Sequence, residues 1–100
     1  RRRGAAALAK YAAELSPRAL EDIEARSPDA AARILRKLRE LEDSPSPRGD
    51  SIKRLKGFET PTYRLRIGDY RAVYRISGTV VVILRIIPRS ELDRALRDLA

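Results

Sequence analysis

Nine lysines and arginines between residues 51 and 90 carry the main chemical signal of this sequence. They are Lys53, Arg54, Lys56, Arg64, Arg66, Arg71, Arg75, Arg85 and Arg89. The same stretch holds two acidic residues, Glu59 and Asp69, and the whole chain of 100 residues has a formal net charge of +8. Such an excess suits a polyanion. Nucleic acid is therefore the first partner to expect, an anionic membrane is the second, and an acidic protein stays open.

Two residue types that the chain does not contain restrict this chemistry further. The sequence has no cysteine and no histidine. Disulfides and cysteine nucleophiles are thereby excluded, as are zinc sites and Ser-His-Asp catalysis. We expect no metal and no cofactor, and any catalysis must use Arg, Lys, Tyr, Ser or carboxylate side chains.

Length and hydropathy predict one domain, residues 1–100, with no membrane segment. A chain of 100 residues is long enough to bury one core. The longest unbroken apolar run, residues 80–84, is too short to cross a bilayer. The N-terminal "RRRGAAALAK" lacks the apolar segment and cleavage site of a signal peptide. We therefore expect a cytoplasmic protein.

The first half of the chain predicts a strand followed by a helical hairpin. Residues 8–15 suit an edge strand, although their alanines also allow a helix. Ser16-Pro17 and Ser27-Pro28 each predict an N-cap followed by the first helical residue. The first helix has Leu20 and Ile23 on one face. The second runs to about Asp43, and its predicted buried stripe is Ala31, Ile34, Leu35, Leu38 and Leu41. A loop over residues 43–51 ends this half.

The second half predicts three antiparallel strands, at residues 62–67, 70–76 and 79–87. Gly68-Asp69 suits a two-residue hairpin turn, which fixes the pairing of the first two strands. Ile67 then faces Tyr70, Leu65 faces Ala72 and Tyr63 faces Tyr74, all on the core side. Because side chains alternate along a strand, the opposite side carries Arg64, Arg66, Arg71, Val73 and Arg75.

The next turn allows two registers, of which we expect the one that buries no lone charge. A two-residue Ser77-Gly78 loop would point Arg85 into the core, which is costly without a partner. A three-residue loop, residues 76–78, reverses the alternation. Val80, Val82, Leu84 and Ile86 then join the core, and Arg85 and Arg89 join the arginine side. Residues 90–100 predict a short helix capped by Ser90, with Leu92, Leu96 and Leu99 in line.

These residues resemble a known family. The string "LKG" followed by "YRLRIGDYRAVYRI" and "VVVILRI" is similar to the RelE/ParE superfamily of toxins from type II toxin–antitoxin systems. The resemblance covers nearly the whole chain and implies a small α+β, RelE-like fold, in which an N-terminal strand and a helical hairpin pack on an antiparallel sheet that a short C-terminal helix follows. It also implies a cognate antitoxin and a toxin–antitoxin hetero-oligomer. The RelE branch implies ribosome-dependent cleavage of mRNA, and the ParE branch implies inhibition of DNA gyrase.

The resemblance also implies site residues. Basic residues around the LKG motif, one arginine on the following strand and one at the end of the last strand are functional in RelE-like members. These positions correspond here to Arg54 and Lys56, to Arg66 and to Arg89. Many members have a histidine before the last arginine and a tyrosine shortly after it. This chain has Pro88 before Arg89 and "SELDR" after it, so it lacks both residues. The resemblance therefore does not assign the general acid and base of the reaction.

Metal-independent RNA cleavage needs groups that stabilise a negatively charged transition state. The ribose 2′-OH attacks the adjacent phosphorus and the 5′-oxygen leaves, while guanidinium groups neutralise the charge that gathers on the phosphoryl oxygens. We assign this role to Arg66 and Arg89, and Lys56 is the candidate base. The other six cations are expected to neutralise RNA or ribosomal phosphates: Lys53, Arg54, Arg64, Arg71, Arg75 and Arg85.

The sequence therefore predicts a toxin that cleaves mRNA on the ribosome as a metal-independent endoribonuclease. The alternatives are a ParE-like toxin that inhibits DNA gyrase without nuclease activity, and a catalytically inactive relative that binds only an antitoxin.

Overall fold

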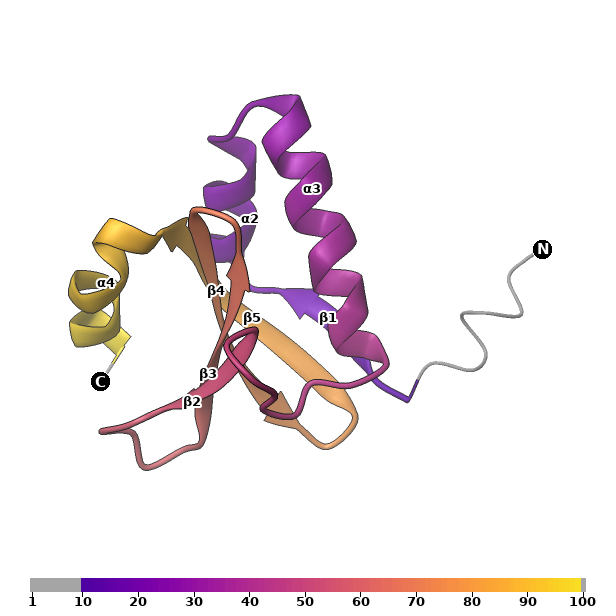
Figure 1. Cartoon of the computed structure of the whole chain (residues 1–100), viewed down its shortest axis with the longest axis vertical. Coiled ribbons are helices and arrows are strands. Elements are labelled where there is room, and N and C mark those ends of the chain that lie inside the picture. Colours follow the sequence, from indigo (N-terminus) through magenta and orange to yellow (C-terminus); the bar gives the residue numbers. More distant parts are fainter. Residues whose placement is uncertain (1–9, 100) are drawn as a thin grey trace.

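The computed structural model describes residues 10–99, in which helices lie on both sides of a five-stranded sheet (Figure 1). The elements follow in the order β1 (Ala12–Leu15), α2 (Pro17–Glu24), α3 (Pro28–Arg39), a 3₁₀ turn (Glu40–Glu42), β2 (Ile52–Leu55), β3 (Thr62–Ile67), β4 (Tyr70–Ser77), β5 (Val80–Pro88), a second 3₁₀ turn (Arg89–Glu91) and α4 (Leu92–Leu99). The sheet order is β1-β5-β4-β3-β2, with β1 parallel to β5 and the other pairs antiparallel. The predicted α+β fold is confirmed.

Both predicted helix starts in the first half are confirmed. The Ser16 hydroxyl accepts a hydrogen bond from the Ala19 N–H at 3.1 Å, and the Ser27 hydroxyl accepts one from the Ala30 N–H at 3.2 Å. Each cap satisfies a backbone donor that the first helical turn leaves without a partner. The strand predicted over residues 8–15 is observed at Ala12–Leu15, and residues 8 and 9 lie outside the described residues.

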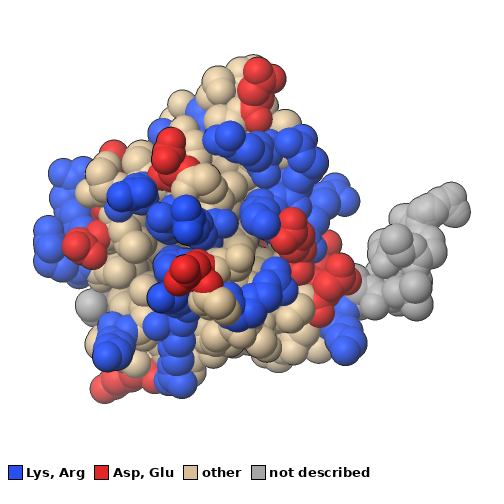
Figure 2. Space-filling model, in the orientation of Figure 1, with Lys and Arg blue, Asp and Glu red and all other residues tan. Residues whose placement is uncertain are grey.

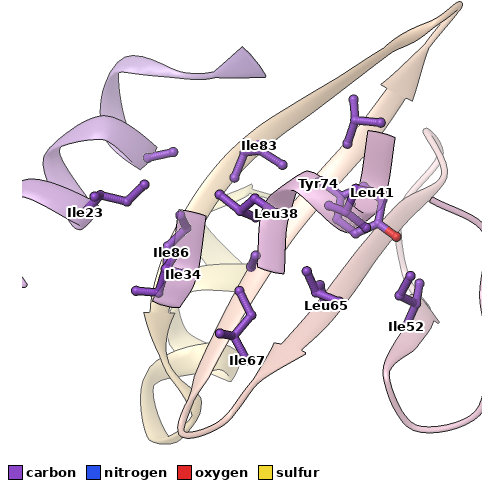
Figure 3. Close-up of a cluster of buried hydrophobic side chains, with 13 residues drawn as sticks. Ile23, Ile34, Leu38, Leu41, Ile52, Leu65, Ile67, Tyr74, Ile83 and Ile86 are labelled. Atoms are coloured by element: carbon purple, nitrogen blue, oxygen red, sulfur yellow. The ribbon is translucent and has the colours of Figure 1, made fainter. Parts of the chain in front are cut away.

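The main core lies between the helical hairpin and one side of the sheet (Figure 3). Ile34, Leu38 and Leu41 pack there against the strands, as predicted. The predicted burial of Leu35 is wrong, because its side chain is 42% exposed, and Leu20 of the first helix is 47% exposed. Each helix meets the sheet along a stripe narrower than its full apolar face, and in α2 this stripe is formed by Ala19 and Ile23.

The β3–β4 register is confirmed, whereas the β4–β5 register differs from the prediction. Leu65 pairs with Ala72 and Tyr63 pairs with Tyr74, on the core side. At the next turn Ser77 pairs with Val80 around a two-residue loop, and Leu84 is the extra residue of a β-bulge farther along β5. The alternation is therefore reversed inside the strand rather than at the turn. The predicted core residues Val80, Val82 and Leu84 are only partly buried, while Val81, Ile83 and the predicted Ile86 are fully buried.

Strand β2 was not among the predicted elements. It has one buried apolar residue, Ile52, followed by the exposed Lys53 and Arg54, so its sequence lacks the alternation of a core strand. It pairs with β3 at the edge of the sheet, where charged side chains discourage pairing with another chain.

A second, smaller apolar cluster lies on the other side of the sheet, under α4. Figure 1 shows α4 across the sheet from α2 and α3. Val73 and Ile87 point to this side and are buried, as is Ala95 of α4. The predicted stripe of α4, residues 92, 96 and 99, is half-buried. Among residues 10–99, no helix has the length and apolar composition needed to cross a membrane.

Candidate nucleic-acid interface

Four arginines converge near the β3–β4 turn, on the α4 side of the sheet. Arg64 and Arg66 alternate with core residues along β3, and Arg66 pairs directly with Arg71 of β4. The backbone N–H of Arg89 donates to the Asp69 carbonyl at 2.8 Å, which holds the end of β5 against the turn. Burial, and the nearby charges of Arg64, Arg66 and Arg89, lower the pKa of the Arg71 guanidinium. We call Arg64, Arg66, Arg71 and Arg89 the arginine cluster.

Backbone carbonyl groups hold part of this cluster in place. Nη1 of Arg64 donates to the Asp50 carbonyl at 2.7 Å, and Nη1 of Arg71 donates to the Gly68 and Tyr70 carbonyls at 2.8 Å each. These bonds orient the guanidinium groups without neutralising them. Within residues 10–99, none of the four arginines forms an ion pair with a carboxylate.

Two carboxylates lie near the cluster. Asp69 acts against the lowering of the Arg71 pKa. Asp50 pairs with Lys53 at 3.1 Å, and the hydrogen bond and charge of Lys53, followed by the charges of Arg66 and Arg64, lower the pKa of the Asp50 carboxyl. The group therefore keeps a net positive charge. Lysine and arginine side chains also cover much of the face seen in Figure 2, with acidic groups scattered between them.

Of the cations near the LKG motif, Arg54 and Lys56 lie apart from the arginine cluster, and Lys53 lies at its edge. Leu55 pairs with Thr62, so Lys56 follows β2 at the start of β3, whereas Arg66 lies near the end of that strand. Four residues of β-strand separate these positions by roughly 13 Å. Arg54 pairs with Tyr63 on the edge strand, and Lys53 pairs with Arg64. Of these three cations, Lys53 is the nearest to the cluster.

Two further predicted site residues are held by other side chains. Arg85 forms an ion pair with Asp22 of α2, in which Nε lies 2.8 Å from Oδ2, and this hydrogen bond raises the pKa of Arg85. Both side chains are about seven-eighths buried, with 14% and 13% exposed. Nε of Arg75 donates to the Thr62 hydroxyl at 3.0 Å. Arg85 is thus committed to a structural contact, which its sequence position on the arginine side does not reveal.

The tyrosines of β3 and β4 lie on the opposite side of the sheet from the cluster. Tyr74 is fully buried and donates to the Pro45 carbonyl at 2.6 Å, and burial raises the pKa of its phenol. Tyr63 stacks on Tyr74 with ring centroids 5.5 Å apart, and the Arg26 guanidinium lies 5.1 Å from the Tyr70 ring centroid. These positions agree with the predicted core role of the tyrosines.

The cluster can bind phosphate and stabilise negative charge, since each guanidinium offers several N–H donors. Sequence reasoning gave Arg71 only a peripheral role, although its predicted pairing partner, Arg66, already placed it beside a proposed catalytic residue. Within residues 10–99, no group of three or more His, Cys, Asp or Glu side chains is placed to hold a metal ion.

Comparison with known proteins identifies the family. The model of the ParE toxin of the type II toxin–antitoxin system parDE matches residues 13–93. The chain belongs to this family, within the RelE/ParE superfamily. The toxin has no match among curated protein sequences.

Solved structures of RelE proteins share the toxin's fold. The RelE–RelB complex from Pyrococcus horikoshii OT3 has 27% identity and a TM-score of 0.68, covering 80% of this chain and 96% of that chain. The RelBE2 complex from Mycobacterium tuberculosis has 29% identity and a TM-score of 0.70, covering 80% and 99%. The intact RelBE complex from E. coli has 27% identity and a TM-score of 0.63, covering 78% and 95%. Each of these relatives is a toxin–antitoxin complex.

Proposed function

We propose that this toxin is a ribosome-dependent, metal-independent endoribonuclease that cleaves mRNA at the arginine cluster. The observation that supports this most directly is the environment of Arg71, whose pKa is lowered by burial and by three neighbouring arginines. Like charges placed side by side oppose folding. Their convergence without ion pairs to carboxylates of residues 10–99 therefore suits an external anion, and the RNA backbone supplies phosphates in series.

In the proposed reaction the 2′-OH attacks the adjacent phosphorus, the bond to the 5′-oxygen breaks, and that oxygen leaves with a proton. Arg66, Arg71 and Arg89 stabilise the charge on the phosphoryl oxygens, and Arg64 positions the substrate. Lys53, Arg54, Lys56 and Arg75 bind flanking phosphates or bases of the mRNA or ribosomal RNA. We keep Arg85 out of this interface, because Asp22 holds its guanidinium.

The arginine cluster contains no side chain suited to act as the general base or general acid of this reaction. The chain has no histidine, its tyrosines of β3 and β4 lie across the sheet, and Lys56 is roughly 13 Å along β3 from Arg66. We therefore propose that water or a ribosomal group takes the proton of the 2′-OH, and that water or a ribosomal group likewise gives a proton to the leaving 5′-oxygen. Activity that depends on the ribosome follows naturally from this arrangement.

The same observation supports a second candidate function, inhibition of DNA gyrase without nuclease activity. A toxin of this kind needs the cationic surface for binding and needs no acid or base. A gyrase supercoiling assay distinguishes it from the proposed nuclease, since a gyrase inhibitor blocks supercoiling and leaves mRNA on translating ribosomes intact. A relative that binds only an antitoxin would be inactive in both assays.

The test of the nuclease is single-turnover cleavage on programmed ribosomes, read by primer extension. Arg66→Ala, Arg71→Ala and Arg89→Ala should each lower the saturated rate about a hundredfold or more, because they remove groups aimed at the transition state. Arg64→Ala should mainly weaken binding. Arg71→Lys keeps the charge but loses the planar fork, so we expect an intermediate rate.

The matched control is Arg36→Ala, which removes one exposed positive charge from α3, away from the cluster. It should change the saturated rate less than twofold. Equal losses in all of the arginine variants, including Arg36→Ala, would mean that the cations act only through total charge. The catalytic assignment would then be wrong.

The proposed partner in the cell is a cognate antitoxin that forms a hetero-oligomer with the toxin in the cytoplasm. The net charge of +8 suits an acidic or amphipathic segment, and the structural relatives are themselves toxin–antitoxin complexes. A groove of about 350 Å³ lies between β1 and α3, where Leu15 and Leu35 are exposed beside Arg39. Apolar side chains of such a segment can bind in this groove. Copurification with the product of the neighbouring gene tests this pairing, and a toxin that stays alone would contradict it.

A further inference from the structure

A second cavity lies on the arginine side of the sheet, at the opposite end of the β3–β4 ribbon from the arginine cluster. Its volume is about 390 Å³, and its lining residues are Gly57, Phe58, Glu59, Thr60, Arg75 and Leu99. The loop between β2 and β3 forms one wall, and the last turn of α4 forms another. The cavity is therefore built from three parts of the chain that the fold brings together.

Arg75 is held in a fixed orientation at this cavity. Its Nε donates to the hydroxyl of Thr62, which is fully buried and itself donates to the Thr60 carbonyl at 2.9 Å. The guanidinium carbon lies 5.8 Å from the centroid of the Phe58 ring. Among residues 10–99, no carboxylate forms an ion pair with Arg75 and no recorded hydrogen bond uses its Nη nitrogens. Its terminal N–H donors are therefore available to a ligand.

These properties match a flat, partly polar ligand better than a simple anion. Phe58 and Leu99 provide apolar walls, while Arg75 and Glu59 provide a donor and an acceptor. A lone phosphate would lie against apolar surface and close to the Glu59 carboxylate. A nucleobase has faces that stack on aromatic rings and guanidinium planes, and edges that accept and donate hydrogen bonds.

We propose that this cavity binds one unpaired base of the RNA strand whose backbone crosses the arginine cluster. The inference rests on the proposed function, because it takes single-stranded RNA as the ligand. Arg71 and Arg75 lie on the same side of β4, four residues apart, which corresponds to roughly 13 Å. A short single-stranded segment spans this distance. The base that enters the cavity then fixes the register of the strand relative to the scissile phosphate.

The experiment measures binding of the full toxin to a fluorescent nine-nucleotide single-stranded RNA, and to versions in which one nucleotide at a time lacks its base. At one position, loss of the base should weaken binding to the wild-type toxin about 5- to 150-fold. Phe58→Ala should weaken binding to the intact RNA by a similar factor. The same abasic RNA should then show no further loss with Phe58→Ala, because both changes remove one stacking contact. The salt dependence of binding should stay unchanged, since no phosphate contact is lost.

Three further variants separate stacking from damage to the loop. Phe58→Leu keeps an apolar side chain without the aromatic ring, and we expect most of the loss to persist. Thr62→Val keeps the shape of a buried side chain but removes the acceptor for Arg75, so a smaller loss is expected. Leu20→Ala removes an exposed leucine from α2, far from the cavity in sequence, and should leave binding unchanged.

Two outcomes would overturn the base pocket, and they differ in what they say about the proposed function. If the wild-type toxin binds RNA with a normal salt dependence but neither Phe58→Ala nor any abasic position weakens binding, the pocket is wrong and the nuclease proposal stands. If the wild-type toxin neither binds the nine-nucleotide RNA nor cleaves mRNA on ribosomes, both proposals fall together.

Discussion

The helix side of the sheet and the arginine cluster differ in whether their polar side chains have partners of opposite charge or hydrogen-bonding character. Two polar groups that are largely buried on the helix side, the Tyr74 hydroxyl and the Arg85 guanidinium, have hydrogen-bond partners in the loop before β2 and in α2. Tyr74 donates to Pro45, and Asp22 accepts from both Arg85 and the Ile86 N–H. In the cluster, Arg66 and Arg71 face each other across a strand pair, and neither forms an ion pair with a carboxylate of residues 10–99. The first arrangement stabilises the fold, and the second opposes it.

Two arginines show this difference most directly. The hydrogen bond that Arg85 donates to Asp22 raises the pKa of Arg85, whereas burial and three neighbouring cations lower the pKa of Arg71. Residues whose interactions destabilise the folded state tend to mark functional sites, because function requires them at some cost in stability. Substitutions on the helix side should therefore reduce stability and leave activity intact, and substitutions in the cluster should do the reverse.

The largest effect on stability is expected from Asp22→Ala. This carboxylate accepts from Arg85 Nε and from the Ile86 N–H at 2.8 Å each, at a part of β5 that extends beyond its pairing with β1. Its removal leaves a mostly buried cation and a backbone donor without partners. We expect the free energy of unfolding, measured by urea denaturation, to fall by about 3 kcal/mol.

Asp22→Asn is the matched control, because its one amide oxygen keeps an acceptor for the Ile86 N–H, whereas the charge and the second acceptor for Arg85 are lost. It should destabilise the protein by about half as much as Asp22→Ala. Cleavage by properly folded protein should be unchanged in both variants. If Asp22→Ala is as stable as the wild type, the Asp22–Arg85 ion pair contributes nothing to stability. The contrast drawn between the helix side and the arginine cluster would then be wrong for this pair.

A smaller effect, with a characteristic pH dependence, is expected from Tyr74→Phe. At pH 7 the variant should lose about 1 kcal/mol of stability, because the Pro45 carbonyl loses its donor. Burial raises the pKa of Tyr74, so in the folded protein the phenol stays protonated at a pH where the unfolded chain ionises, above about pH 10. The advantage of tyrosine is therefore complete below pH 10 and should shrink by about 1.4 kcal/mol per pH unit above it.

Unfolding curves of the wild type and the variant between pH 7 and pH 11 give this difference directly, since all other titrating groups are shared. A difference that stays constant across this range would show that Tyr74 ionises as readily in the folded protein as in the unfolded chain.

The parts of the fold that local rules fix were predictable from sequence. The Gly68-Asp69 turn sets the register that pairs Leu65 with Ala72, and this pairing alone places three of the four cluster arginines on one side. The two Ser-Pro caps fix the starts of α2 and α3 for the same reason, since cap and first turn are neighbours in the chain.

The parts that depend on distant contacts were not predictable. The bulge at Leu84 follows from no local turn signal, so Val81 and Ile83 were assigned to the wrong side of β5. Likewise nothing in the sequence links Asp22 to Arg85, which are 63 residues apart. Strand β2 was missed because its edge position needs only one buried side chain, Ile52.

The smallest predicted effect is a gain in stability, which tests directly whether repulsion between the clustered arginines destabilises the fold. Arg66 pairs directly with Arg71, is exposed, and makes no side-chain hydrogen bond among the described residues, so Arg66→Gln removes a repulsion together with a weaker attraction to the exposed Asp50. We expect a gain of about 0.5 kcal/mol in urea denaturation at low ionic strength. This gain should vanish near 1 M salt, where charges are screened within about 3 Å. Arg36→Gln, on exposed α3, should show less than half of the gain. A loss of stability that salt does not change would mean that Arg66 supports the fold, and its lack of a carboxylate partner would then carry no functional meaning.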